Sequence, residues 1–246
     1  MEELTQRQIE ILRAIIQEYT DTGLPVGSEI LEKKYKLGVS PATIRNEMVE
    51  LAKKGYLKKQ YFSSGRIPSA KGFRFFIKNL MKEKVLATSD EVSYKNSIWD
   101  ERNDPNRLLS QATKVLSKKT RFLSLTVTDR GDIYYSGVGY LLERPEFFDV
   151  RLARHFFLRL DEVSFWERII NEFMRINEDV IYFLGEEDFY DPLFENCASV
   201  FGEFENEEIK GIIGVIGPKR MPYAFVIPQV RYFSGLIDRL LKGEKI

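Results

Sequence analysis

The sequence contains very few side chains of the kinds that bind metals or act as nucleophiles. Its 246 residues include one cysteine, Cys197, and one histidine, His155. A single cysteine excludes an intrachain disulfide and any zinc site built from several cysteines. Histidine, cysteine and carboxylate residues nowhere show the spacing of metal ligands. We therefore expect no metal and no other cofactor.

The chain also lacks a long hydrophobic run. No apolar stretch approaches the roughly 20 residues that a membrane-spanning helix requires. The N-terminal segment MEELTQRQ is acidic and polar, unlike a secretion signal. With 43% hydrophobic residues, the chain can form real cores in one or two domains. These features predict a soluble cytoplasmic protein.

The chain also has a formal net charge of zero, but its charged residues are unevenly distributed along the sequence. Residues 1–84 contain 16 basic and 10 acidic side chains, whereas residues 85–246 contain 21 and 27. The imbalance is steepest between Arg45 and Lys82, where ten lysines or arginines face only two glutamates. A local basic segment on a neutral protein indicates a polyanionic partner for the first part of the chain.

Three helices are predicted before and within this basic segment. A capping-box pattern begins a helix over residues 5–21. Ser28 is expected to cap a short second helix over residues 29–35. A turn containing glycine then leads to Ser40, which is expected to cap the third helix. This succession is the order of a helix-turn-helix motif.

The third helix has the residue types of a DNA-recognition helix. Ile44, Met48 and Leu51 recur at helical spacing and predict a buried stripe. Asn46 points the opposite way, with Arg45 at the edge of the stripe. Asparagine reads adenine and arginine reads guanine in the major groove. The alternative is an ordinary amphipathic helix with a solvated face, and the basic neighbours favour recognition.

A short hairpin is predicted after the third helix. Residues 56–61 favour a strand, residues 62–66 a flexible turn, and residues 66–68 the returning strand. The glycine and serines of the turn allow close approach to DNA, and Arg66 supplies a cation. Ser69 is expected to cap a fourth helix. The hairpin therefore predicts the wing of a winged helix, with a plain surface hairpin as the alternative.

The third helix and the hairpin together define a predicted DNA-binding surface. The helix supplies hydrogen-bonding and cationic side chains for base edges, and the hairpin supplies groups for the phosphate backbone. The predicted contact residues are Ser40, Thr43, Arg45, Asn46, Lys53, Ser63, Ser64, Gly65 and Arg66.

The rest of the chain predicts a second domain of mixed helices and strands. Residues 1–84 form the predicted winged-helix domain, residues 85–119 a linker and connecting helix, and residues 120–246 the C-terminal domain. Strands are expected at 122–127, 133–135, 180–184, 198–204 and 209–216, and helices at 150–160, at 163–176 and from Pro222 onward. The fold class is therefore α+β, with a mostly antiparallel sheet and flanking helices in the second domain.

Enzyme chemistry has little support in the sequence. A Cys–His nucleophile pair would need His155 and Cys197 to meet, but one lies in a helical pattern and the other precedes an apolar strand. The glycines in KGIIGVIGPKR lack the spacing of a phosphate-binding loop and favour close packing of a strand. We therefore expect no enzymatic activity.

Two regions of the chain resemble the HrcA family of heat-inducible transcription repressors. The segments LTQRQIEILRAIIQEYTDTGLPVGS, LGVSPATIRNEMVEL and SSGRIPSAKGFRFF are similar to that family's winged helix. GVGYLLERPEFFD, FENCASVF and GVIGPKRMPYAFVIPQV resemble its GAF-like C-terminal domain, in the same order. The resemblance covers residues 4–83 almost continuously and about half of residues 136–241.

This resemblance implies a DNA-binding repressor of chaperone operons that occupies an inverted-repeat operator, and a chaperonin that assists its folding. A two-fold operator implies a homodimer. The family's inserted dimerisation subdomain has no room here, because the chain passes from a hairpin directly into GVGYLLERPEF. The candidate dimer surfaces are then the helix around residues 108–116, the fourth helix and the closing helix.

Two other functions remain open at this point. The GAF-like half could sense a small molecule, in a pocket lined by Phe156, Phe157, Trp166 and Phe173, although helical spacing assigns these rings to the core first. The winged helix could also bind a protein instead of DNA, and its retained cations oppose that alternative.

Overall fold

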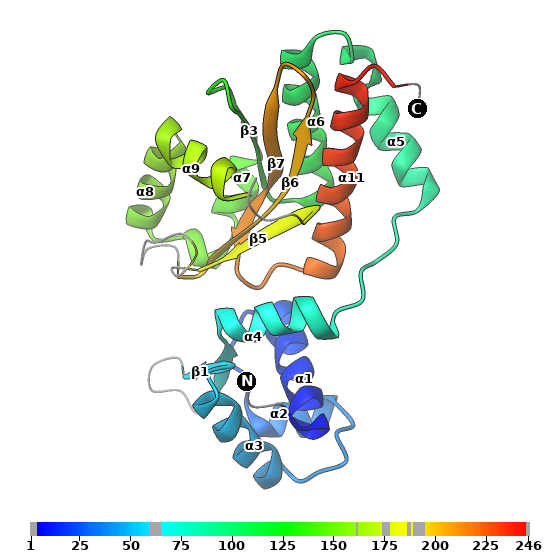
Figure 1. The fold of residues 1–246 in the computed structure, drawn as a ribbon. Coiled ribbons are helices and arrows are strands. Elements are labelled where there is room, and N and C mark those ends of the chain that lie inside the picture. Colours follow the sequence, from blue (N-terminus) through cyan, green and yellow to red (C-terminus); the bar gives the residue numbers. More distant parts are fainter. Residues whose placement is uncertain are drawn as a thin grey trace. The chain divides into compact units, whose positions relative to one another are not determined.

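The computed structural model describes residues 4–59, 65–160, 162–173, 178–185, 188 and 195–244. The chain forms two compact units, which are coloured along the sequence in Figure 1. The first unit is Met1–Lys82 with Arg220–Pro222, and the second is Glu83–Lys219 with Tyr223–Ile246.

The first unit is a winged helix-turn-helix, as predicted. Its two strands pair antiparallel, with Lys58 opposite Ile67. The elements in chain order are α1 (Gln6–Thr22), α2 (Ser28–Lys34), α3 (Pro41–Lys53), β1 (Leu57–Lys59), β2 (Arg66–Pro68), α4 (Ala70–Phe75) and the π-helical turn η1 (Phe76–Leu80).

Side-chain caps define where three of these helices begin. The Thr5 hydroxyl accepts from the amide of Gln8, and the Gln8 side chain accepts from the amide of Thr5, which completes a capping box. The Ser40 and Ser69 hydroxyls cap α3 and α4 as predicted. The prediction for Ser28 is wrong, because it is the first residue inside α2 and its side chain is buried.

The fourth helix and the turn that follows it bury only one of their four large apolar side chains on this side completely. Phe73 is completely buried, but Phe76, Ile77 and Leu80 are only partly buried. The amide of Met81 donates to the carbonyl of Phe76, five residues earlier, so this last turn is π-helical. A π-turn is wider than an α-turn, and it rotates the later side chains away from the buried side.

The second unit is built on a five-stranded sheet. Its strands are β3 (Leu123–Thr128), β4 (Ile133–Ser136), β5 (Val180–Leu184), β6 (Cys197–Glu205) and β7 (Lys210–Pro218). They are arranged in the order β4-β3-β7-β6-β5, and every neighbouring pair is antiparallel. The predicted α+β class, with a winged helix followed by a GAF-like antiparallel sheet, is confirmed.

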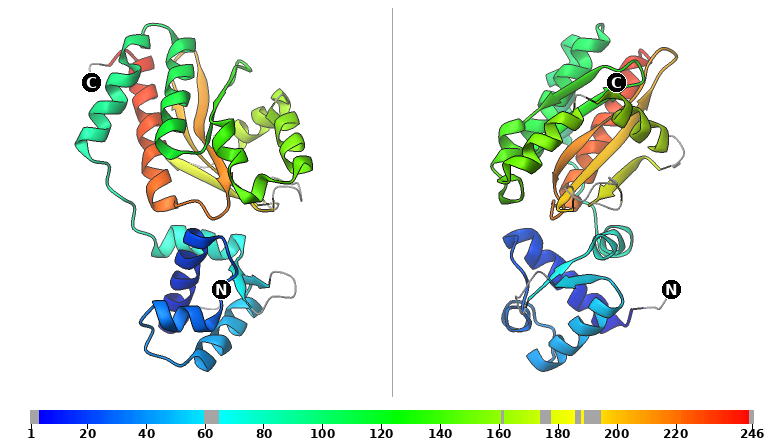
Figure 2. Two further views of the ribbon diagram at one scale, coloured as in Figure 1. Left: turned by 180° about the vertical axis from the view of Figure 1, so that it is seen from behind. Right: turned by 90° about the vertical axis from the view of Figure 1, so that its left-hand side faces the viewer.

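Helices cover both faces of this sheet (Figure 2). One face is covered by α6 and α11, and α5 packs on these helices; the other is covered by α7, α8 and α9. The bounds are α5 (Thr88–Ile98), η2 (Trp99–Glu101), α6 (Pro105–Thr120), α7 (Val138–Leu142), η3 (Pro145–Phe147), α8 (Val150–Leu160), α9 (Val163–Phe173) and α11 (Tyr223–Leu241).

Helix α5 lies where the sequence predicts a linker. Its Tyr94 stacks on Phe233 of α11 with ring centroids 5.1 Å apart, and Ile98 is completely buried. These are the only two buried residues of the helix. Two apolar positions are too few to create a helical period in the sequence, which is why the helix escapes prediction.

The β7 glycines allow close packing, as predicted. A β-carbon at Gly214 would overlap the carbonyl oxygen of Val200 on the neighbouring strand. A β-carbon at Gly211 would meet the Phe204 ring at 2.5 Å. These glycines are therefore needed by the sheet and do not form a phosphate loop.

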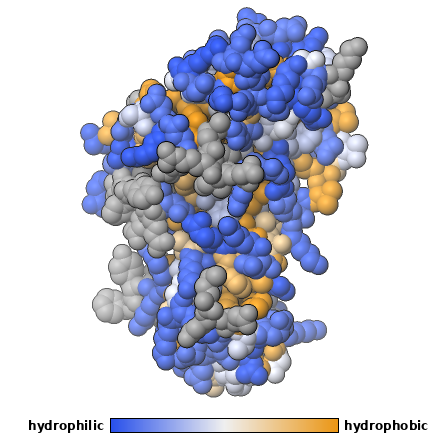
Figure 3. All heavy atoms as spheres, in the orientation of Figure 1, coloured by the Kyte–Doolittle hydropathy of each residue, from blue (hydrophilic) through white to orange (hydrophobic). Residues whose placement is uncertain are grey.

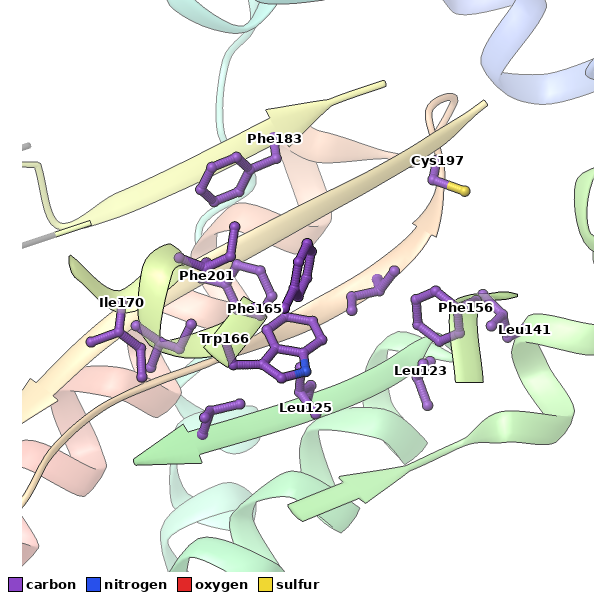
Figure 4. Close-up of a cluster of buried hydrophobic side chains, with 14 of the residues drawn as sticks. Leu123, Leu125, Leu141, Phe156, Phe165, Trp166, Ile170, Phe183, Cys197 and Phe201 are labelled. Atoms are coloured by element: carbon purple, nitrogen blue, oxygen red, sulfur yellow. The ribbon is translucent and has the colours of Figure 1, made fainter. Parts of the chain in front are cut away.

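The sheet face under α7, α8 and α9 carries a hydrophobic core of the second unit (Figure 4). Trp166 is 1% exposed, and its ring meets Phe165 and Phe201 edge-on at 5.0 Å and 6.3 Å. Its indole N–H donates to the Arg159 carbonyl at 2.9 Å, so the polar end of the buried ring is satisfied. Cys197 belongs to the same core and is completely buried.

The visible surface of the molecule is mainly hydrophilic, with smaller hydrophobic areas between the polar side chains (Figure 3). Among the described residues, no helix is both long enough and apolar enough to cross a membrane.

Candidate nucleic-acid interface

Helix α3 is fixed in the first unit by one side and exposed on the other. Ile44 and Leu51 are completely buried, and Met48 is nearly so. Arg45 and Asn46 lie on the exposed side. The predicted division of this helix into a core stripe and a solvent face is therefore confirmed.

A groove of about 470 Å³ runs beside the exposed side of α3. Helix α3 contributes Arg45 to it, and the hairpin contributes Lys59 from β1 and Arg66 from β2. Glu29 of α2 is the one acidic residue in its lining. The fold thus brings together cations from the helix and from the wing that are up to 21 positions apart in the sequence.

The two acidic side chains of the basic segment are already engaged. Glu47 accepts a hydrogen bond from Gln8 Nε2 at 3.0 Å and lies 3.6 Å from Arg7. Glu50 pairs with Lys53 at 2.7 Å. Because Glu47 is turned toward α1, the exposed side of α3 is more positive than its sequence indicates.

The predicted helix contacts fall into two groups. The hydroxyls of Ser40 and Thr43 lie 3.1 Å apart, and Ser40 also accepts from the amide of Thr43, so both contribute to the cap. Lys53 is held by its ion pair with Glu50. By contrast, the side chains of Arg45 and Asn46 have no hydrogen-bond or ion-pair partner in the part of the chain that the structure describes. Their donor groups are free to meet base edges.

The wing residues lie differently from their prediction. Arg66 is the first residue of β2, and its backbone exchanges two 2.9 Å hydrogen bonds with Val26. Gly65 is buried, and a β-carbon there would lie 2.8 Å from Cβ of Pro25. Both residues therefore form the base of the wing and not its turn. Ser63 and Ser64 lie outside the described residues.

A buried carboxylate connects α1 to the end of α2. Glu18 is 5% exposed and accepts from Lys34 Nζ at 2.6 Å and from the Tyr35 hydroxyl at 3.2 Å. Burial, together with the negative charge of Glu18, raises the pKa of Tyr35 to about 12. Tyr35 therefore remains a hydrogen-bond donor to Glu18 well into the alkaline range, and the contact joins α1 to the end of α2.

The residues considered for enzyme chemistry lie in structural positions. Cys197 is buried in the core of the second unit, and His155 lies on α8. Within the described ranges, no group of three or more histidine, cysteine or acidic residues could hold a metal ion. Of the aromatic residues considered for a ligand pocket, Phe156 and Trp166 are core residues and Phe157 packs against that core. The side chain of Phe173 lies outside the described part.

Two protein-family models match this chain. The model described as the HrcA protein C terminal domain matches residues 68–227, and the model of the LexA DNA binding domain matches residues 1–64. The heat-inducible transcription repressor HrcA of Desulforamulus reducens is 25% identical over 346 residues, covering 98% of this chain and 99% of that protein. The corresponding repressor of Carboxydothermus hydrogenoformans is 42% identical over 125 residues, covering 51% of this chain and 37% of that protein.

A solved structure shares the fold over nearly the whole chain. The crystal structure of a hypothetical protein superposes with a TM-score of 0.77 at 17% identity, covering 98% of each chain. The alignment with the Desulforamulus reducens protein has 346 positions, 100 more than this chain has residues. At least that many aligned positions have no residue here, which agrees with a shortened form.

Proposed function

This chain belongs to the HrcA family, and we propose that it is a heat-inducible transcription repressor of chaperone operons that binds double-stranded DNA through its winged helix. HrcA is a family of transcription repressors and not of enzymes. One observation supports the DNA-binding surface above all others: the free side chains of Arg45 and Asn46 lie together on the exposed side of α3, with Arg45 in a groove that the wing completes.

The proposed contacts follow from this geometry. Helix α3 enters the major groove, where Asn46 reads adenine and Arg45 reads guanine. Arg66, at the base of the wing, contacts the phosphate backbone, and Lys59 adds a second cation. Ser40, Thr43 and Lys53 of α3 complete the proposed set of DNA contacts from this helix. In this proposal residues 1–84 bind DNA, residues 85–119 connect, and residues 120–246 form the GAF-like regulatory domain.

We further propose a cytoplasmic repressor whose folding is assisted by the chaperonin, so that heat, which diverts the chaperonin, lowers the amount of active repressor. The relatives' description as heat-inducible supports this regulation. Sensing of a small molecule has weaker support, because Phe156 and Trp166 are packed in the core and Phe157 packs against it.

A homodimer on an inverted-repeat operator completes the proposal. Two linked recognition helices gain affinity because the second binds at high effective concentration. The burial of apolar side chains favours one of the three candidate dimer surfaces over the other two. The apolar side chains of the helix around residues 108–116, and most of those on α11, are buried inside the second unit. The part-exposed side chains of Phe76 and Ile77 on the fourth helix remain candidates.

Replacing Arg66 by alanine is expected to weaken binding to all DNA sequences by a similar factor. Each phosphate contact contributes about −0.9 to the slope of the logarithm of affinity against the logarithm of salt concentration. The slope should therefore become shallower by about 1, as measured by fluorescence anisotropy between 50 and 200 mM salt. Arg151→Ala is the control, because Arg151 is exposed on α8 of the second unit. An unchanged slope for Arg66→Ala would exclude this contact.

Sedimentation of the protein with DNA tests the dimer. The probe is the duplex that the wild-type protein enriches from a pool of random DNA, called the selected duplex below. Two chains per selected duplex are expected at saturation, because each half-site accepts one recognition helix. Analytical ultracentrifugation gives the stoichiometry, and a single chain on a complete inverted repeat would contradict the dimer.

A further inference from the structure

An exposed valine lies among the polar residues of the recognition helix. Val49 is 37% exposed, three positions after Asn46 and four after Arg45. Residues at these spacings are neighbours on one side of a helix. Val49 therefore belongs to the same surface as the two free donors, although it was not among the predicted contact residues.

The buried stripe of α3 does not require valine at this position. Ile44, Met48 and Leu51 already complete the buried stripe of α3. A β-branched side chain has a lower helix propensity than alanine, lysine or glutamine, any of which suits an exposed helical position. The part of the Val49 side chain that stays exposed to water also adds little to stability. The residue type therefore fits a partner surface better than it fits the free protein.

The groove beside α3 shows what kind of partner surface this is. Val49 lines it together with Met48 and with Ile30 of α2, which is 40% exposed. The same groove contains Arg45, Lys59 and Arg66. A small apolar surface flanked by three cations and one carboxylate, that of Glu29, matches an anionic polymer that presents an isolated apolar group. In the major groove of DNA, that group is the C5-methyl of thymine.

We propose that Val49 reads the methyl group of a thymine in each half-site. This inference rests on the proposed binding of DNA by α3. Residues four apart are separated by about 6 Å along a helix, and base pairs are about 3.4 Å apart. The thymine therefore lies within a few base pairs of the one that Arg45 contacts. In this proposal α3 distinguishes thymine by its methyl group, in addition to the adenine and guanine contacted by Asn46 and Arg45.

Exchange of single thymines for uracil tests the inference, because it removes only the methyl group. Each thymine of the selected duplex is replaced in turn by uracil, and affinity is measured by fluorescence anisotropy. At one position in each half-site, the exchange is expected to lower the affinity of the wild-type protein about fourfold. This factor corresponds to the free energy gained by burying one methyl-sized group. Val49→Ala should bind the unmodified duplex more weakly by a similar factor and should be insensitive to uracil at that position.

Val92→Ala is the matched control, because Val92 is an exposed valine on α5 of the second unit. This variant should retain the full response to uracil, and all three proteins should be fully folded at the temperature of the titration. The inference is overturned if no thymine responds to uracil, or if Val49→Ala responds as strongly as wild type. If the wild-type protein enriched no duplex at all, the proposed function would also be overturned. That outcome is distinct from the two above, which overturn only the role of Val49.

Discussion

Replacing Arg45 and Asn46 together by alanine is expected to lower the affinity for the selected duplex by about 2–6 kcal/mol. Each side chain is free and exposed on α3, and each good base contact contributes about 1–3 kcal/mol of discrimination. Affinity for unrelated DNA should fall much less, because phosphate contacts supply that part of binding. Anisotropy titrations with the selected and a scrambled duplex measure both affinities.

Folding of this double variant should be nearly unchanged, since surface substitutions usually alter stability by less than about 0.5 kcal/mol. The matched control is Arg154→Ala with Asn103→Ala, which removes the same residue types from exposed positions of the second unit. That control should bind the selected duplex as wild type does. Equal binding by both double variants would show that α3 does not read the operator.

Replacing Trp166 by alanine is expected to lower the unfolding free energy of the second unit by about 3–5 kcal/mol. The ring is 1% exposed, contacts two other buried aromatic rings, and donates its only N–H to a backbone carbonyl. Truncation removes these contacts and leaves a cavity in the core. Urea denaturation, followed by far-ultraviolet circular dichroism, measures the loss.

Phe148→Ala provides the control for this experiment, because Phe148 is 65% exposed in the same unit. Its removal should change the unfolding free energy by less than about 0.5 kcal/mol. A cost for Trp166→Ala as small as that of the control would mean that the ring lines an open space. The small-molecule sensor would then become the stronger hypothesis.

The recognition helix is predictable because local and tertiary preferences agree there. Ser40 caps it, and the stripe of Ile44, Met48 and Leu51 has a clear helical period. The strands of the second unit are equally predictable from the sequence, since β3, β5, β6 and β7 are continuous apolar or alternating runs. Each lies within two residues of its predicted bounds.

Features that depend on one or two contacts are not predictable in this way. Helix α5 buries only Tyr94 and Ile98, and the π-turn that begins at Phe76 follows α4 without any sequence signal. The buried position of Gly65 depends on Pro25, forty residues earlier. Long-range packing of this kind overrides the local preference of Gly-Arg for a turn.

The groove beside α3 could be identified only from the folded structure. Arg45, Lys59 and Arg66 are recognisable as cations in the sequence, but only the antiparallel pairing of β1 with β2 places the hairpin cations opposite α3. Val49 could have been found from its place on the outward face, since an apolar residue among free donors is itself a signal. Its significance becomes clear only from the apolar neighbours in the groove.

Selection from random double-stranded DNA by the full chain, followed by sequencing, tests the central claim most directly. Wild-type protein should enrich one family of inverted repeats, with half-site centres about 10–10.5 base pairs apart or at a multiple of that distance. The Arg45→Ala, Asn46→Ala double variant should enrich no such sequence. Failure of the wild-type protein to enrich any sequence, or recovery of the same repeat by the double variant, would contradict the assignment of α3 as the reader of the operator.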